Sequence, residues 1–183
     1  MNIDRIVRLG ILLIAVVTLA SCSARLSPFT QEIYDRAGLS ENELTQIQFY
    51  LSEDIVLRRG ITAGETVVKE GKIRMVDGRR VEEVRIPRGT PGVLLFTPRE
   101  NRFAISFEEG DDDAYLMFGP NPKIDDRYAL LAREWKRNRG KVSYKGRLYD
   151  VDATSAYSVL LVDLKRVGQT EYRSHRASGR KVN

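Results

Sequence analysis

The chain has 183 residues, 42% of them hydrophobic and 30% charged, with a formal net charge of +5 at pH 7. This length suffices for one domain with a buried core, and the basic excess is too mild to indicate a nucleic-acid partner. With one cysteine and one histidine, a disulfide framework and a zinc site of the usual kind are both excluded.

The N-terminus has the layout of a secretory signal. Arg5 and Arg8 precede an apolar stretch over 9–19, and small residues then lead to Cys22. A transmembrane helix needs about 20 apolar residues, and Arg25 ends the uncharged stretch before that length is reached. A conventional cleavage site with an ordinary cysteine nearby is a third interpretation.

The run Leu19-Ala20-Ser21-Cys22 resembles the lipobox of bacterial lipoproteins. The resemblance implies a signal peptide over 1–21 and a thioether-linked diacylglycerol on Cys22, which becomes the first residue and is usually acylated on its amino group. It therefore implies a protein held by its lipid on a membrane of the cell envelope. Ser23, standing where an aspartate would retain such proteins in the inner membrane, favours the outer membrane of a cell that has one.

Two short helices are predicted next. The first covers 30–37 and ends at Gly38, and the second begins at a capping box formed by Ser40 and Glu43. Apolar and polar residues then alternate over 47–51, which predicts a strand.

Successive β-hairpins are predicted after Gly60. At Asp77-Gly78 we expect a four-residue loop that sets Val76 opposite Val81, in preference to a two-residue loop.

Three strands around the next two turns are expected to share one apolar face, because side chains on a strand alternate with period two. This predicted face contains Leu94, Phe96, Phe103, Ile105, Phe107, Tyr115 and Met117.

A later hairpin turns at Lys145-Gly146. A two-residue loop there sets Val142 opposite Tyr149, on one face with Tyr144 and Val151. The apolar run over 157–167 suits a central strand packed on both sides.

The segment 126–138 is open to two interpretations. Tyr128, Leu131, Ala132 and Trp135 follow helical spacing between an acidic start and a C-terminal glycine, which favours a helix. The alternative is a strand that leads into the Val142 hairpin.

These elements define the expected organisation: a polar tether over 22–30, a globular domain over 31–167 and a basic disordered tail over 168–183. The domain is predicted to be mainly β, a single antiparallel barrel or a two-sheet sandwich of about seven to nine strands.

No catalytic constellation is recognisable in the sequence. His175, the only histidine, falls in the expected tail, and no phosphate-binding glycine motif occurs. The acidic run 108–113 offers Asp111 and Asp113 as weak candidate calcium ligands, although a solvated hairpin loop explains it better. We therefore expect no cofactor and no enzymatic activity.

Two further groups of residues have ordinary structural interpretations beside functional ones. Several aromatic residues suit a β core better than a ligand cavity: Tyr50, Trp135, Tyr144, Tyr149 and Tyr157. Three basic runs suit solvated turns, or together a surface for anionic lipid or polysaccharide: Arg58-Arg59, Arg79-Arg80 and Lys136-Arg137-Asn138-Arg139.

The sequence thus predicts a lipid-anchored envelope protein that binds another envelope protein as an accessory or structural component. Its expected partners are membrane lipid, through acylated Cys22, and that protein. A barrel that binds a small ligand or glycan is the alternative, and a hydrolase of envelope polymers is a third hypothesis.

Overall fold

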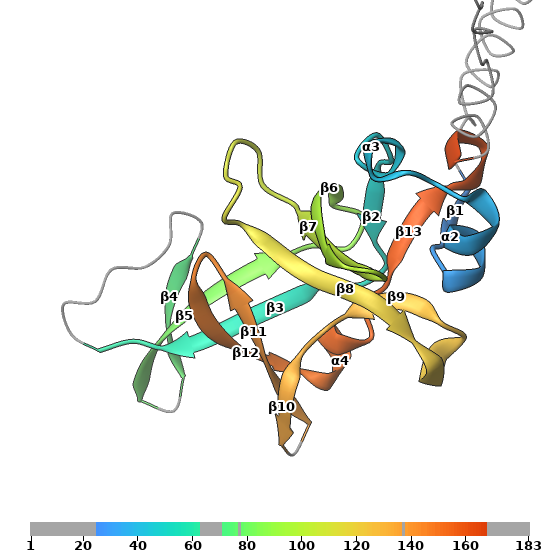
Figure 1. The fold of residues 1–183 in the computed structure, drawn as a ribbon. Coiled ribbons are helices and arrows are strands. Elements are labelled where there is room, and N and C mark those ends of the chain that lie inside the picture. Colours follow the sequence, from blue (N-terminus) through green and yellow to red (C-terminus); the bar gives the residue numbers. More distant parts are fainter. Residues whose placement is uncertain (1–24, 63–70, 77, 137, 168–183) are drawn as a thin grey trace, which may run out of the picture.

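The computed structural model describes residues 25–62, 71–76, 78–136 and 138–167. It confirms a mainly β domain, built from two antiparallel sheets of seven and six strands (Figure 1). The arrangement is a sandwich rather than one closed barrel. Its thirteen strands exceed the predicted seven to nine, because the count includes several of only three or four residues.

The larger sheet has the order β1-β13-β2-β6-β7-β8-β9. Its strands are β1 (Leu26–Pro28), β13 (Leu160–Asp163), β2 (Phe49–Leu51), β6 (Pro91–Arg99), β7 (Arg102–Ser106), β8 (Tyr115–Asn121) and β9 (Arg127–Leu130).

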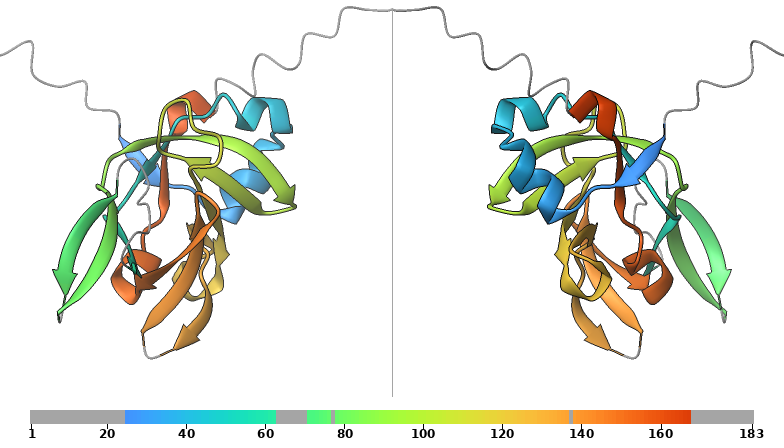
Figure 2. Two further views of the ribbon diagram at one scale, coloured as in Figure 1. Left: turned by 90° about the vertical axis from the view of Figure 1, so that its left-hand side faces the viewer. Right: turned by 90° about the vertical axis from the view of Figure 1, so that its right-hand side faces the viewer.

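The smaller sheet has the order β10-β11-β12-β3-β5-β4. Its strands are β10 (Arg133–Lys136), β11 (Arg139–Tyr144), β12 (Arg147–Asp152), β3 (Ile55–Gly60), β5 (Arg79–Ile86) and β4 (Lys72–Val76). The β4–β5 hairpin projects from the rest of the domain in all views (Figures 1 and 2).

The helices are short: α2 (Gln31–Ala37), α3 (Glu41–Leu44), α4 (Ala153–Ala156) and a 3-10 turn η1 (Pro122–Ile124). Both predicted N-terminal helices are confirmed. Gly38 ends α2 with a φ of 56°, a left-handed conformation that glycine adopts without steric cost. The backbone N–H of Ser40 donates to the Glu43 carboxylate at 2.9 Å, as the capping box requires.

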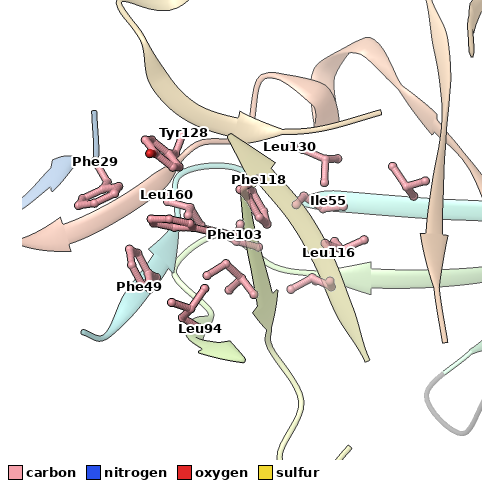
Figure 3. Close-up of a cluster of buried hydrophobic side chains, with 14 of the residues drawn as sticks. Phe29, Phe49, Ile55, Leu94, Phe103, Leu116, Phe118, Tyr128, Leu130 and Leu160 are labelled. Atoms are coloured by element: carbon pink, nitrogen blue, oxygen red, sulfur yellow. The ribbon is translucent and has the colours of Figure 1, made fainter. Parts of the chain in front are cut away.

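The core is centred on aromatic rings from strands distant in the sequence (Figure 3). Phe29, Phe49, Phe103 and Tyr128 are fully buried. The Phe103 and Tyr128 ring centroids are 4.7 Å apart, and Phe29 meets Phe49 edge to face at 5.5 Å. Such pairs add about 0.5–1.5 kcal/mol each beyond the burial of their area.

Four of the structural predictions made from the sequence need correction. The first concerns the tether, which does not extend to residue 30. Residues 26–28 form β1 and pair with β13, and Phe29 has no exposed surface. Burial of Phe29 in the aromatic core therefore makes this segment part of the domain.

The second correction concerns 126–138, where the alternative interpretation holds: the described residues form the strands β9 and β10 rather than the favoured helix. Asp125 and Asp126 have φ values of 58° and 50°, which a helix start does not allow. Tyr128, Ala129 and Leu130 are buried in succession, as in a strand covered on both faces. The helical spacing of the apolar residues was thus coincidental.

The third correction concerns β4 and β5, which are joined by a two-residue loop, so that Val76 lies opposite Arg79 rather than Val81. Every residue of β4 is exposed, and burial therefore gives no advantage to pairing two valines. The preference of an Asp-Gly turn for a two-residue loop decides the register, with Gly78 at a φ of 72°.

The fourth correction concerns 157–167, of which 160–163 is strand and 164–167 is helical. β13 lies between β1 and β2, and β1 forms the edge of the sheet, so β13 is next to the edge strand rather than in the middle of the sheet. Leu160 and Val162 are fully buried, whereas Tyr157 is 58% exposed.

The Lys145-Gly146 hairpin is confirmed, since Val142 lies opposite Tyr149.

Candidate anion-binding hollow

One face of the six-stranded sheet carries a row of alternating charges. Lys141 on β11 bonds to Asp150 on β12 at 2.9 Å, and Asp150 lies opposite Arg58 on β3. Arg58 bonds to Glu83 on β5 at 2.8 Å, and Arg74 on β4 bonds to the same carboxylate at 2.9 Å. Such exposed pairs contribute little stability individually, but they keep this face of the sheet polar.

Beside this row lies a hollow of about 740 Å³, which we call the arginine hollow. Four arginines and two aspartates line it: Arg58, Arg59, Arg79, Arg139, Asp150 and Asp152. Its remaining lining is mostly apolar and includes Val76 and Val81.

Three of the basic runs noted in the sequence meet at this hollow. Antiparallel pairing places the end of β3 beside β5, since Gly60 lies opposite Val81. On the other side, Arg139 of β11 lies opposite Asp152 of β12. The register of the β4–β5 hairpin matters here, because the two-residue loop places Arg79 within the strand rather than in the turn.

The four arginines differ in how far their charges are compensated. Arg59 donates to the fully buried carboxylate of Glu82 at 2.6 Å, and Arg58 bonds to Glu83. Arg79 and Arg139 are both exposed and make no side-chain ion pair within the described ranges. A guanidinium binds carboxylate or phosphate through two parallel hydrogen bonds, so these two arginines are suited to an anionic group.

A buried charged cluster lies behind the hollow, on the opposite face of the sheet. Glu82 is fully buried between Arg59 and Arg147, whose guanidinium lies 3.9 Å away. Burial raises the pKa of the Tyr149 hydroxyl, and the charge of Glu82 raises it further. The cluster fixes Arg59 at the edge of the hollow.

The predicted acidic metal site has another explanation in the structure. The Lys145 ammonium lies 2.6 Å from Glu108 and 3.0 Å from Asp111. Its hydrogen bond holds the pKa of Asp111 below the usual value. Asp113 accepts the backbone N–H of Lys145 through its carbonyl oxygen. The charge that would attract calcium is thus partly neutralised by a lysine.

Acidic residues that neighbour one another in the sequence, such as Glu82 and Glu83, also have structural partners. Glu82 and Glu83 point to opposite faces of β5, as expected for neighbours on a strand. Asp54 accepts the backbone N–H of Arg88 at 2.7 Å, which with the Arg85 guanidinium lowers its pKa. Within the described ranges, no group of three or more His, Cys, Asp or Glu residues is placed to hold a metal ion.

The remaining candidate residues separate into three groups. Cys22 and His175 lie outside the described residues. Tyr144 and Tyr149 are core residues, as their ordinary interpretation predicted. Trp135 belongs to β10.

No protein-family model, no curated protein and no solved structure matches this chain. Among the described residues, no helix has the length and apolar character needed to cross a bilayer.

Proposed function

We propose that the protein is a lipid-anchored, non-enzymatic accessory protein of the cell envelope, which binds another envelope protein through the arginine hollow. The anchor in this proposal is a diacylglycerol on Cys22, and Ser23 favours the outer membrane. The domain itself supplies the binding surface.

β1 begins only four positions after Cys22, which limits the distance between the proposed anchor and the domain. Three residues separate Cys22 from Leu26, the first residue of β1. A fully extended chain advances about 3.3–3.6 Å per residue, so a lipid on Cys22 holds the edge of the seven-stranded sheet within about 14 Å of the bilayer surface. Partners that reach this domain must therefore lie close to the membrane.

The single observation that carries the binding role is the convergence of Arg58, Arg79 and Arg139 from three strands on one open hollow. Two of these charges have no ion-pair partner among the described residues. Folding gains nothing from placing them together, since like charges repel. An acidic surface of a partner protein would compensate both charges, and desolvated arginines often dominate such interfaces.

A second candidate function keeps the anchor and replaces the protein partner by an acidic glycan. Asp150 and Asp152 at the hollow support it, because carboxylates accept hydrogen bonds from sugar hydroxyls. The space between the two sheets is a less suitable ligand site than the arginine hollow, because core side chains such as Phe29, Phe49 and Phe103 fill it.

Chemical crosslinking in intact cells tests the proposal. The wild-type protein should recover a stoichiometric envelope partner, and Arg79→Glu/Arg139→Glu should lose it. Arg36→Glu/Lys165→Glu is the matched control, because it makes the same charge change at exposed residues away from the hollow. Reproducible absence of a partner, or equal recovery by the two double variants, would contradict the proposal.

A further inference from the structure

The seven-stranded sheet has a second apolar face, opposite the core. The sequence pattern predicts Phe96, Tyr115 and Met117 in the core. In the structure, the core face of β6, β7 and β8 instead carries Leu94, Ile105 and Leu116, which lie opposite one another. Phe96 and Met117 both lie opposite Ala104.

A β-bulge produces this second face. The pairing of β6 with β7 shifts between Leu94 and Phe96, and one extra residue in a strand turns the following side chains to the other face. The β7–β8 register places Tyr115 opposite Ser106 and Met117 opposite Ala104, so that both side chains lie on the same face as Phe96. Phe96 is left 38% exposed and meets the Tyr115 ring edge to face at 5.1 Å.

These side chains line a groove of about 680 Å³ between this face and the start of the six-stranded sheet. Leu131, Ala132 and Val142 line its other side. We call it the apolar groove. Its size lies within the range of about 300–1,000 Å³ typical of small-molecule sites.

The charges around the apolar groove all have one sign. Arg99, Arg102, Arg133 and Lys141 line it, and none of the described aspartates or glutamates does. A neighbouring hollow of about 470 Å³ shares Arg102, Leu131 and Ala132 with it. That hollow adds Lys123 and the exposed ring of Tyr157, again without an acidic residue.

We propose that the apolar groove binds an anionic phospholipid, with one acyl chain along Phe96, Tyr115 and Met117 and the phosphate among the arginines. Burial of an alkyl chain removes apolar surface from water, while the cations compensate the charge of the headgroup. Lys141 is already paired with Asp150, but a neutral ligand would leave Arg99, Arg102 and Arg133 without an ion-pair partner among the described residues. A free phosphate would leave the aromatic face exposed. The combination points to an amphiphile of negative charge.

This inference goes beyond the proposed function and uses neither the arginine hollow nor acylation of Cys22. The hollow mixes arginines with carboxylates, and it shares no lining residue with the apolar groove, although β11 contributes to both. The two sites can therefore succeed or fail separately.

Photo-crosslinking from a lipid bilayer tests the proposal. The full chain, purified from membranes, is reconstituted in phosphatidylcholine nanodiscs that contain a small fraction of phosphatidylglycerol with a photoactivatable acyl chain. Mass spectrometry should locate the adducts on peptides of β6 and β8 that contain Phe96, Tyr115 or Met117. Adducts spread evenly over the domain would overturn the assignment.

Two variants separate the apolar and the charged parts of the site. Ser143 is exposed and lines the groove, so Ser143→Trp should block it and abolish these adducts. Val93→Trp is the control, because Val93 is an exposed strand residue that does not line the groove. Arg99→Glu/Arg133→Glu should reduce labelling by phosphatidylglycerol at least about fivefold, given the usual contribution of a cation near anionic lipid.

The remaining outcomes are also decisive. Equal labelling by a matched photoactivatable phosphatidylcholine would overturn recognition of the anionic headgroup. Displacement of phosphatidylglycerol by an acidic amphipathic peptide at lower concentration than by unlabelled lipid would assign the groove to a protein partner instead. Loss of crosslinking in Ser143→Trp with recovery of the envelope partner unchanged would support the lipid site and the hollow as separate features.

Discussion

Replacement of Glu82 by alanine should destabilise the protein much more than the same replacement of Glu83, the next residue along β5. Glu82 is fully buried, and Arg59, whose side chain is 13% exposed, lies 2.6 Å from it. Glu83 is 12% exposed, and its partners Arg58 and Arg74 are 45% and 58% exposed. The two glutamates thus form similar pairs in different surroundings.

The magnitudes follow from those surroundings. Breaking a buried ion pair by removing one partner costs about 3–5 kcal/mol, because the other charge stays buried without compensation. An exposed pair contributes about 0.2–1 kcal/mol, so the two pairs of Glu83 together contribute about 1 kcal/mol. We therefore expect Glu82→Ala to lower the free energy of unfolding by at least about 2 kcal/mol more than Glu83→Ala.

Urea denaturation of both variants, followed by circular dichroism, measures the difference. Raising the salt concentration to 1 M shortens the screening length to about 3 Å, so it should reduce the effect of Glu83→Ala and leave that of Glu82→Ala nearly unchanged. Arg59→Met combined with Glu82→Leu should recover most of the loss, since an apolar pair can replace a buried ion pair. Equal losses in the two single variants, with the same salt dependence, would refute the reasoning.

Three further predictions concern the core, the acidic loop and a close contact. Tyr128→Phe removes the hydroxyl that donates to Gln31 at 3.0 Å and should cost about 1 kcal/mol. Because burial raises the pKa of Tyr128 above its ordinary 10.0, wild-type stability should fall as the pH rises past 10, and this variant should reduce that fall in alkaline urea titrations. Lys145→Met should let the pKa of Asp111 rise toward 3.8, measured by NMR titration. In the wild type, the stability that the Lys145–Asp111 pair supplies should be complete above pH 3.8, the ordinary pKa of the carboxyl group, and should be lost as the pH falls through its lower pKa in the folded protein. An unchanged pKa of Asp111 in Lys145→Met would contradict this contact. A Cβ on Gly92 would lie 2.6 Å from the Phe107 ring, so Gly92→Ala should lower the melting temperature, whereas Gly60→Ala, with no atom within 4 Å of its Cβ, should not.

Local signals in this sequence predict local structure well. The capping box at Ser40, the stop at Gly38 and the two-residue turn at Lys145-Gly146 all occur as expected. Each depends on a few adjacent residues whose backbone preferences are strong. The mainly β class follows from repeated signals of this kind.

Register is where sequence reasoning was wrong. The predicted apolar face contains both Ile105 and Met117, whereas in the structure Ile105 lies opposite Leu116 and Met117 lies opposite Ala104 on the other face. The strand Tyr-Leu-Met-Phe is apolar at every position, so both registers bury apolar side chains and the pattern cannot choose between them. The shift in the β6–β7 register between Leu94 and Phe96 leaves no mark in the apolar pattern either.

The candidate sites depend on these same long-range pairings. The basic runs of the arginine hollow were visible in the sequence as separate groups, but their meeting depends on β12 lying between β11 and β3. The apolar groove was concealed because Phe96, Tyr115 and Met117 looked like core residues. The apolar run over 115–118 was a signal in the sequence that both faces of this strand are in contact with other groups.

Anchoring through Cys22 can be measured by mass spectrometry of the N-terminal peptide of the protein isolated from native membranes. We expect a peptide that begins at Cys22 and carries a diacylglycerol on its sulfur, and we expect this peptide to be absent in Cys22→Ser. A mature N-terminus at any other residue, or Cys22 with a free thiol, would contradict it.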